Sequence, residues 1–201
     1  MSKNELTTEK MTQALGWAYE KALNGIPGDL SSESLAKSYM KRFSSTDEAI
    51  HSLIKWQTAK SSTSGFVTGL GGIVTLPVAV PVNIASVLYV QMRMIAAIAY
   101  MRGYDLKDDQ VQTFVFICLT GQAASDILKQ SGITVGTKLT VQLIKKVPGT
   151  TLTKINQKVA FRLVTKFGEK GVINLGKLVP VVGGVIGASV DGVGTKIIGN
   201  Q

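Results

Sequence analysis

The chain of 201 residues contains one cysteine, Cys118, and one histidine, His51. A single cysteine cannot form an internal disulfide or a thiolate metal cluster, and Cys118 stands in an apolar run typical of a small buried side chain. One histidine alone is too few for the usual zinc sites, so we expect His51 to be solvated and no metal to be bound. The scarcity of cysteine favours a reducing, cytoplasmic location, and no signal peptide is visible at the N-terminus.

Catalytic patterns are also lacking. The sequence has no Ser, His and acid constellation and no G-x-S-x-G, and the acidic pairs at 47–48 and 108–109 fall at predicted helix starts. Segment 171–178 matches G-x-x-x-x-G-K, but it has Leu178 where a nucleotide-binding loop needs Ser or Thr, and no strand precedes it. We therefore expect a non-enzymatic protein without a cofactor.

Acidic residues are scarce in the C-terminal third. Residues 1–128 hold eleven Lys or Arg and eleven Asp or Glu, whereas residues 129–201 hold eleven Lys or Arg against Glu169 and Asp191 only. The whole net charge of +9 therefore belongs to the last third. Such an asymmetry suggests a basic face that meets an anionic partner.

An uncharged run covers residues 61–92. Pro77 and Pro81 each remove a backbone donor and push the preceding residue away from helical angles, so one continuous helix is not expected. The prolines divide the region into two arms, 62–75 and 81–102. The sequence therefore predicts an apolar helical hairpin.

Neither arm is a good transmembrane helix. A span needs ~20 predominantly apolar residues, and the first arm is shorter. The second arm contains Arg93, which near mid-bilayer costs at least ~2.5 kcal/mol. We expect the hairpin to be buried or re-entrant, and the sequence leaves open whether it enters lipid. One half of the second arm is polar and predicts a wet side: Asn83, Ser86, Gln91, Arg93 and Arg102.

Apolar spacing elsewhere predicts a single all-α domain, a compact multi-helix bundle with the Gly/Pro-rich hairpin packed centrally. Ser45 and Glu48 form a capping box that starts one helix, and Gly25 and Gly132 supply helix stops. The other expected helices are 8–23, 32–43, 106–129, 134–146, 151–167 and 181–198.

A basic amphipathic helix is expected within 151–170. Its cations recur every four positions, and its apolar residues occupy the other arc. The alternative is the solvated outer face of a core helix, but no Glu lies at i±4 before Glu169, which favours a functional face. The candidate membrane- or anion-binding residues are Lys154, Lys158, Arg162, Lys166 and Lys170, with Lys145 and Lys146 ahead of them.

Small residues recur at helical spacing near the C-terminus and in the first arm. Such rows let two helix backbones approach closely, in membranes or in soluble hairpins. The candidate helix-packing residues are Gly65, Gly69, Gly72, Pro77, Pro81, Gly183, Gly184 and Gly187. Asp191 follows Gly183 and Gly187 at the same spacing. If its carboxylate is buried, it needs a cation such as Arg93 or Arg102; the alternative is that Asp191 lies at a helix end.

Segment 65–105, "GFVTGLGGIVTLPVAVPVNIASVLYVQMRMIAAIAYMRGYD", resembles the signature region of the EcsC protein family, with a glycine-rich arm, two prolines, a long helix and a closing Gly-Tyr-Asp. Segment 179–196 resembles the family's second glycine-rich segment, although the family often has Asn where this chain has Asp191. The likeness covers about 35–199 and makes 1–34 a less typical N-terminal extension. It implies a bacterial, mostly helical protein on the cytoplasmic side, encoded in the founding case beside an ABC transporter, and it brings no catalytic residues.

Three functions compete. The leading hypothesis is a peripheral membrane adaptor that binds an anionic membrane surface and, as a further partner, a transporter or other membrane protein. Nucleic-acid binding through the same face is disfavoured, because Phe161 and Phe167 are the only aromatic residues there and Phe167 is expected to face the core. The third is a soluble helical domain that encloses a lipid or other apolar ligand. The oligomeric state stays open.

Overall fold

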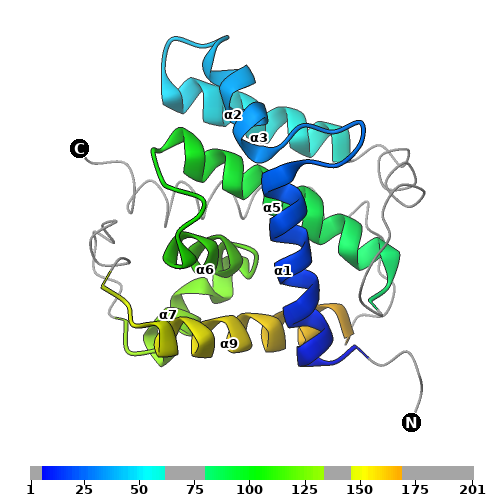
Figure 1. The fold of residues 1–201 in the computed structure, drawn as a ribbon, viewed down its shortest axis with the longest axis vertical. Coiled ribbons are helices and arrows are strands. Elements are labelled where there is room, and N and C mark those ends of the chain that lie inside the picture. The colour runs from blue at the N-terminus through cyan, green and yellow to red at the C-terminus, as the bar shows by residue number, and fades with distance from the viewer. Residues whose placement is uncertain (1–5, 62–79, 134–145, 169–201) are drawn as a thin grey trace.

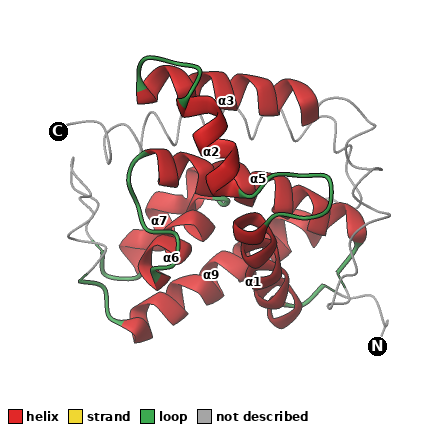
Figure 2. Cartoon of the chain, turned by 45° about the horizontal axis from the view of Figure 1, so that its top comes forward, coloured by secondary structure: helices red, strands yellow, loops and turns green. Residues whose placement is uncertain are grey.

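The computed structural model describes residues 6–61, 80–133 and 146–168, and these residues form helices and loops without a strand (Figures 1 and 2). The predicted all-α bundle is confirmed. The described helices are α1 (Thr8–Asn24), α2 (Ser32–Met40), α3 (Thr46–Ser61), α5 (Val82–Met101), α6 (Asp109–Cys118), the 3-10 turn η1 (Gly121–Ala123), α7 (Ala124–Gln130) and α9 (Gly149–Gly168).

Helix α5 lies at the centre of the described bundle, where it packs against α1, α2, α3 and α6 (Figure 1). It begins directly after Pro81. The N–H groups at the start of a helix have no partner within the helix, so the N–H that proline lacks costs little there. Fifteen of its 20 residues are buried, because almost every side of the helix meets a neighbour. This helix is the second arm of the predicted hairpin.

The predicted wet side of α5 is wrong. Ser86, Gln91 and Arg93 are only 6%, 7% and 2% exposed. The Ser86 hydroxyl donates to the carbonyl of Val82 at 2.8 Å, and Arg93 finds its acceptors in the loop between α1 and α2. Because Ser86 and Arg93 find hydrogen-bond partners inside the protein, they need no contact with water, and their position on one half of the helix did not indicate solvent.

Helix α1 is an integral part of the bundle and packs against α5 and α9. Its N-cap is Thr7, whose hydroxyl accepts a hydrogen bond from the backbone N–H of Lys10 at 3.3 Å. Tyr19 ties α1 to the loop before α6, because its hydroxyl donates to the carbonyl of Leu106 at 2.7 Å. The buried face is Met11, Ala14, Leu15, Trp17, Ala18, Tyr19 and Ala22.

The single helix predicted over 106–129 is wrong, because two α-helices with a 3-10 turn between them occupy this region. The break follows Thr120, whose hydroxyl donates to the carbonyl of Ile117 at 2.6 Å. Gly121 then takes a φ of +60°, which residues with side chains rarely adopt. The predicted stop at Gly132 is confirmed by its φ of +77°.

Helix α9 crosses one end of the molecule and packs against α1, α6 and α7 (Figures 1 and 2). Its buried residues are Leu152, Ile155, Val159, Ala160 and Leu163. This is the apolar arc that the sequence predicts, with Val164 and Phe167 half-buried beside it. The opposite arc is therefore left for solvent or a partner.

Gly25 ends α1 in a conformation that only glycine adopts readily, with φ 79° and ψ 173°. A Cβ there would lie 3.1 Å from both the carbonyl oxygen of Asp29 and the backbone nitrogen of Ser31. We expect Gly25→Ala to lower the free energy of unfolding by about 2–3 kcal/mol, measured by urea denaturation.

Gly28→Ala is the matched control, because Gly28 also has a positive φ, of 83°, but no atom lies within 4 Å of the place that an added Cβ would take. We expect a loss of about 1 kcal/mol there, from backbone strain alone. Equal losses for both variants would show that the close approach around Gly25 contributes nothing.

Several predicted features lie outside the described residues. They include the first arm of the hairpin, with Gly65, Gly69, Gly72 and Pro77, and the segment 171–178. The helix expected over 181–198 also lies outside, and so does the helix expected over 134–146 except for its last residue, Lys146. The single residues outside are Lys145, Lys170, Gly183, Gly184, Gly187 and Asp191.

Candidate functional site

The outer face of α9 carries the predicted cations. Lys154 and Arg162 are exposed, and Lys158 and Lys166 are half-buried. Four-residue spacing advances each position by only about 40° around a helix, so these side chains form one slanting row. Lys146, three residues before α9, is exposed as well.

An open groove of about 1150 Å³ lies along this row, between α9, the first turns of α1, and α7. Figure 1 shows the start of α1 and α7 meeting α9 at the same end of the molecule. Most of the residues that line it are of polar type, although apolar atoms supply more of the lining surface: Thr8, Glu9, Thr12 and Gln13 from α1; Ala123, Asp126, Ile127 and Gln130 from η1 and α7; and Thr153, Lys154, Asn156, Gln157, Lys158, Phe161 and Arg162 from α9.

The cations of the groove are not neutralised by carboxylates of the described residues. Within that part of the chain, Lys154 and Arg162 form neither an ion pair nor a side-chain hydrogen bond. Lys158 is held differently, because its ammonium donates to the carbonyl of Gln130 at 2.7 Å, at the C-terminal end of α7 where carbonyls favour a cation. Two of the three cations are thus available to a ligand.

An aromatic side chain stands in the same row. Phe161 is 64% exposed and lines the groove between Lys158 and Arg162. No binding role was predicted for it from the sequence, although its position three residues after Lys158 places it on the basic face rather than in the apolar arc. The predicted inward orientation of Phe167 is supported by its half-burial against the core.

Two carboxylates, Glu9 and Asp126, also line the groove and were not anticipated. Hydrogen bonds from its own backbone N–H and from the Thr7 hydroxyl lower the pKa of Glu9, so this carboxyl stays ionised at neutral pH. Asp126 is exposed in the first turn of α7. The groove therefore presents both signs of charge, with the cations on α9 and the anions on α1 and α7.

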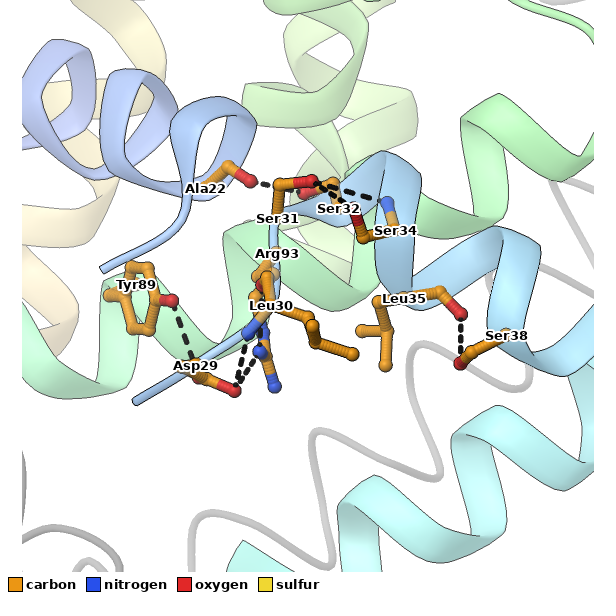
Figure 3. Close-up of polar contacts among 10 residues, drawn as sticks. All are labelled: Ala22, Asp29, Leu30, Ser31, Ser32, Ser34, Leu35, Ser38, Tyr89 and Arg93. Carbon is orange, nitrogen blue, oxygen red and sulfur yellow. Dashed lines mark hydrogen bonds and ion pairs between the residues drawn. The ribbon is translucent and has the colours of Figure 1, made fainter. Parts of the chain in front are cut away.

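A second polar cluster, the Arg93 cluster, lies inside the protein (Figure 3). The Arg93 guanidinium pairs with the carboxylate of Asp29 and donates to the carbonyl of Leu30 at 3.0 Å. The Tyr89 hydroxyl donates to the same carboxylate at 3.3 Å. The cluster fastens the α1–α2 loop to the central helix, and every member is accounted for by packing, so we regard it as structural.

The partner of Arg93 among the described residues is therefore Asp29, which the sequence patterns did not single out. The suggested partner Asp191 lies outside the described residues, and the other arginine considered for it, Arg102, pairs with Asp47. Asp29 was missed because its pairing depends on the loop geometry after Gly25, which no spacing rule encodes.

Comparison with known proteins decides the family. A family model described as the EcsC protein family matches residues 2–200. The chain belongs to the EcsC protein family. No curated protein and no solved structure matches it. The matched region begins well ahead of residue 35, where the likeness seen in the sequence begins, and this agrees with the packing of α1 into the EcsC bundle.

The described residues of this EcsC protein contain no group of three or more His, Cys, Asp or Glu side chains placed to hold a metal ion. His51 is exposed on α3, as expected. One described helix, α5, is long and apolar enough to cross a membrane, but most of it is buried in the protein, as in the core helix of a soluble domain.

The thiol of Cys118 packs against the core, and burial raises its pKa to about 12. Because only the thiolate is nucleophilic, we expect the folded EcsC protein to react with a maleimide at pH 7.5 at least about 100-fold more slowly than the urea-unfolded chain. Mass spectrometry of timed samples measures this difference. Equally fast labelling of both states would contradict the burial.

Proposed function

We propose that this EcsC protein is a non-enzymatic, cytoplasmic adaptor that binds the surface of an anionic membrane peripherally through the exposed face of α9. The observation that carries the proposal is the row of Lys154, Phe161 and Arg162, in which two cations without a carboxylate partner among the described residues flank an exposed aromatic ring. Basic residues around an apolar anchor are typical of helices that lie at a lipid interface.

The expected affinity is modest. Each Lys or Arg near an anionic leaflet contributes on the order of 1 kcal/mol, and full burial of a Phe side chain contributes roughly 1.5–3 kcal/mol. Lys146, Lys154 and Arg162 together with Phe161 give about 5 kcal/mol, which corresponds to a dissociation constant between millimolar and micromolar. Binding of this strength is reversible and sensitive to salt.

The adaptor role is supported by exposed apolar side chains at the other end of the molecule. Trp56 on α3 is 65% exposed, and Leu30, Met40 and Phe43 near α2 are 51%, 41% and 37% exposed. Helices α2 and α3 lie opposite α9 in both views (Figures 1 and 2). With α9 against lipid, these side chains would remain free to contact a membrane protein.

Cosedimentation with vesicles tests the proposal. We expect the protein to pellet with vesicles rich in phosphatidylglycerol at about 50 mM salt, to stay in solution with pure phosphatidylcholine, and to be released from the anionic vesicles near roughly 500 mM salt, because salt screens exposed charges. A gel shift with double-stranded DNA at about 150 mM salt is the companion measurement. Strong DNA binding without vesicle binding would contradict the membrane role and favour nucleic acid as the partner.

A further inference from the structure

The charges of the groove are separated by sign and remain unpaired across it. Lys154 and Arg162 stand on the α9 side, Glu9 on α1 and Asp126 on α7, and no ion pair within the described residues joins the two sides. A ligand that is only anionic would be repelled by the two carboxylates, whereas a ligand with a phosphate and an amine meets a complementary charge on each side.

A hydrogen-bond acceptor in the groove also lacks a donor. The Oδ1 atom of Asn156 is buried without a hydrogen-bond partner among the described residues, and Asn156 lines the groove. Because this oxygen is closed to solvent, a donor reaches it only after the Asn156 side chain turns outward, and the carboxylates of Glu9 and Asp126 are the acceptors that a ligand meets directly. A primary ammonium has three N–H donors, whereas the quaternary ammonium of choline has none.

The groove is large enough for such a group and open enough for it to stay attached to a lipid. Its volume of about 1150 Å³ exceeds what a headgroup alone fills. Phe161 is exposed beside it, where an acyl chain or the glycerol backbone would contact the ring. A headgroup could therefore enter the groove while the rest of the lipid remains in the bilayer.

We propose that this groove binds the phosphoethanolamine headgroup of a phospholipid, with the phosphate on Lys154 and Arg162 and the ammonium between Asp126 and Glu9. The inference rests on the membrane role proposed above and names the lipid class. It turns a general attraction to negative charge into a preference for one headgroup.

Vesicles with equal phosphatidylglycerol content test the preference, with the remainder either phosphatidylethanolamine or phosphatidylcholine. We expect about tenfold tighter binding with phosphatidylethanolamine, the effect of one hydrogen bond between charged groups. Equal binding to both would overturn this inference and leave the proposed function intact. Absence of binding to either would overturn both.

A preference for phosphatidylethanolamine vesicles has two explanations: recognition of the headgroup, or the looser packing of bilayers that contain this lipid. The variant Asp126→Asn distinguishes them. We expect this variant to bind the phosphatidylcholine mixtures at least as tightly as the wild type, because one repulsive carboxylate is gone, and to lose the preference. Asp109→Asn is the matched control, because Asp109 is an exposed carboxylate in the first turn of α6 that does not line the groove. A preference that survives in Asp126→Asn, or that disappears equally in Asp109→Asn, would contradict the assignment.

Competition with a soluble headgroup is a third test of the proposal. Glycerophosphoethanolamine at millimolar concentration is expected to displace the wild-type protein from the mixed vesicles, and glycerophosphoglycerol is expected to displace it much less. Equal displacement by the two compounds would show that the groove recognises only the phosphate and would contradict the proposal.

Discussion

Reversal of both free cations, in Lys154→Glu with Arg162→Glu, is expected to weaken binding to phosphatidylglycerol vesicles by about 1000-fold. Two favourable contributions of roughly 1 kcal/mol each are lost, and two repulsions of similar size replace them, so the change is about 4 kcal/mol. Both side chains are exposed, so the fold should persist. Because the wild type has only about 5 kcal/mol of binding free energy, cosedimentation should detect no binding of this variant at millimolar lipid, and circular dichroism checks the helical content.

The matched control for net charge is Lys41→Glu with Lys55→Glu. Both lysines are exposed near α2 and α3, at the end opposite α9, and the pair changes the net charge by the same amount. We expect a decrease of less than about tenfold, because charges farther than a Debye length of about 10 Å from the surface are largely screened. Equal decreases in the two double variants would mean that net charge alone drives binding.

Arg93→Ala is expected to lower the free energy of unfolding by about 3–5 kcal/mol. The guanidinium is 2% exposed, and its removal leaves the partly buried Asp29 carboxylate without its cation and the Leu30 carbonyl without its donor. In a chain of this length the melting temperature should fall by about 10 °C. Urea denaturation and thermal melting both measure the effect.

Two further variants identify its cause. Arg102→Ala removes an ion pair whose Asp47 partner is 67% exposed, and we expect a loss below about 1 kcal/mol. Arg93→Met combined with Asp29→Asn removes both buried charges, and it should recover most of the stability that Arg93→Ala loses. If the double variant is as unstable as Arg93→Ala, the damage comes from packing and not from an unpaired charge.

The helices were largely predictable because their signals are local. The apolar spacing of α1, the Ser45 cap ahead of α3 and the glycine stops each act within one or two turns. In the structure the Glu48 backbone N–H donates to the Ser45 hydroxyl at 3.2 Å, which is one of the two hydrogen bonds of a capping box. The break at Gly121 escaped prediction because a glycine inside a helical pattern is often tolerated.

The candidate site was predictable only in part. The spacing of Lys154, Lys158 and Arg162 placed them on one face, because helical geometry alone determines this. Glu9 and Asp126 escaped prediction, since they reach the same groove from α1 and α7 through tertiary packing. Arg93 was misread as facing water for the same reason, because its partner lies in another loop.

The proposed membrane role depends most directly on which face of the protein meets lipid. Gln157→Cys on α9 and Ser44→Cys between α2 and α3 both place a thiol at an exposed position, at opposite ends of the molecule. Each variant can carry a polarity-sensitive fluorophore, because the half-buried Cys118 has a raised pKa and should react slowly in the folded protein. When anionic vesicles are added, docking through α9 predicts a blue shift of the emission at position 157 and none at position 44. A shift at position 44 alone, or the same shift at both positions, would contradict it.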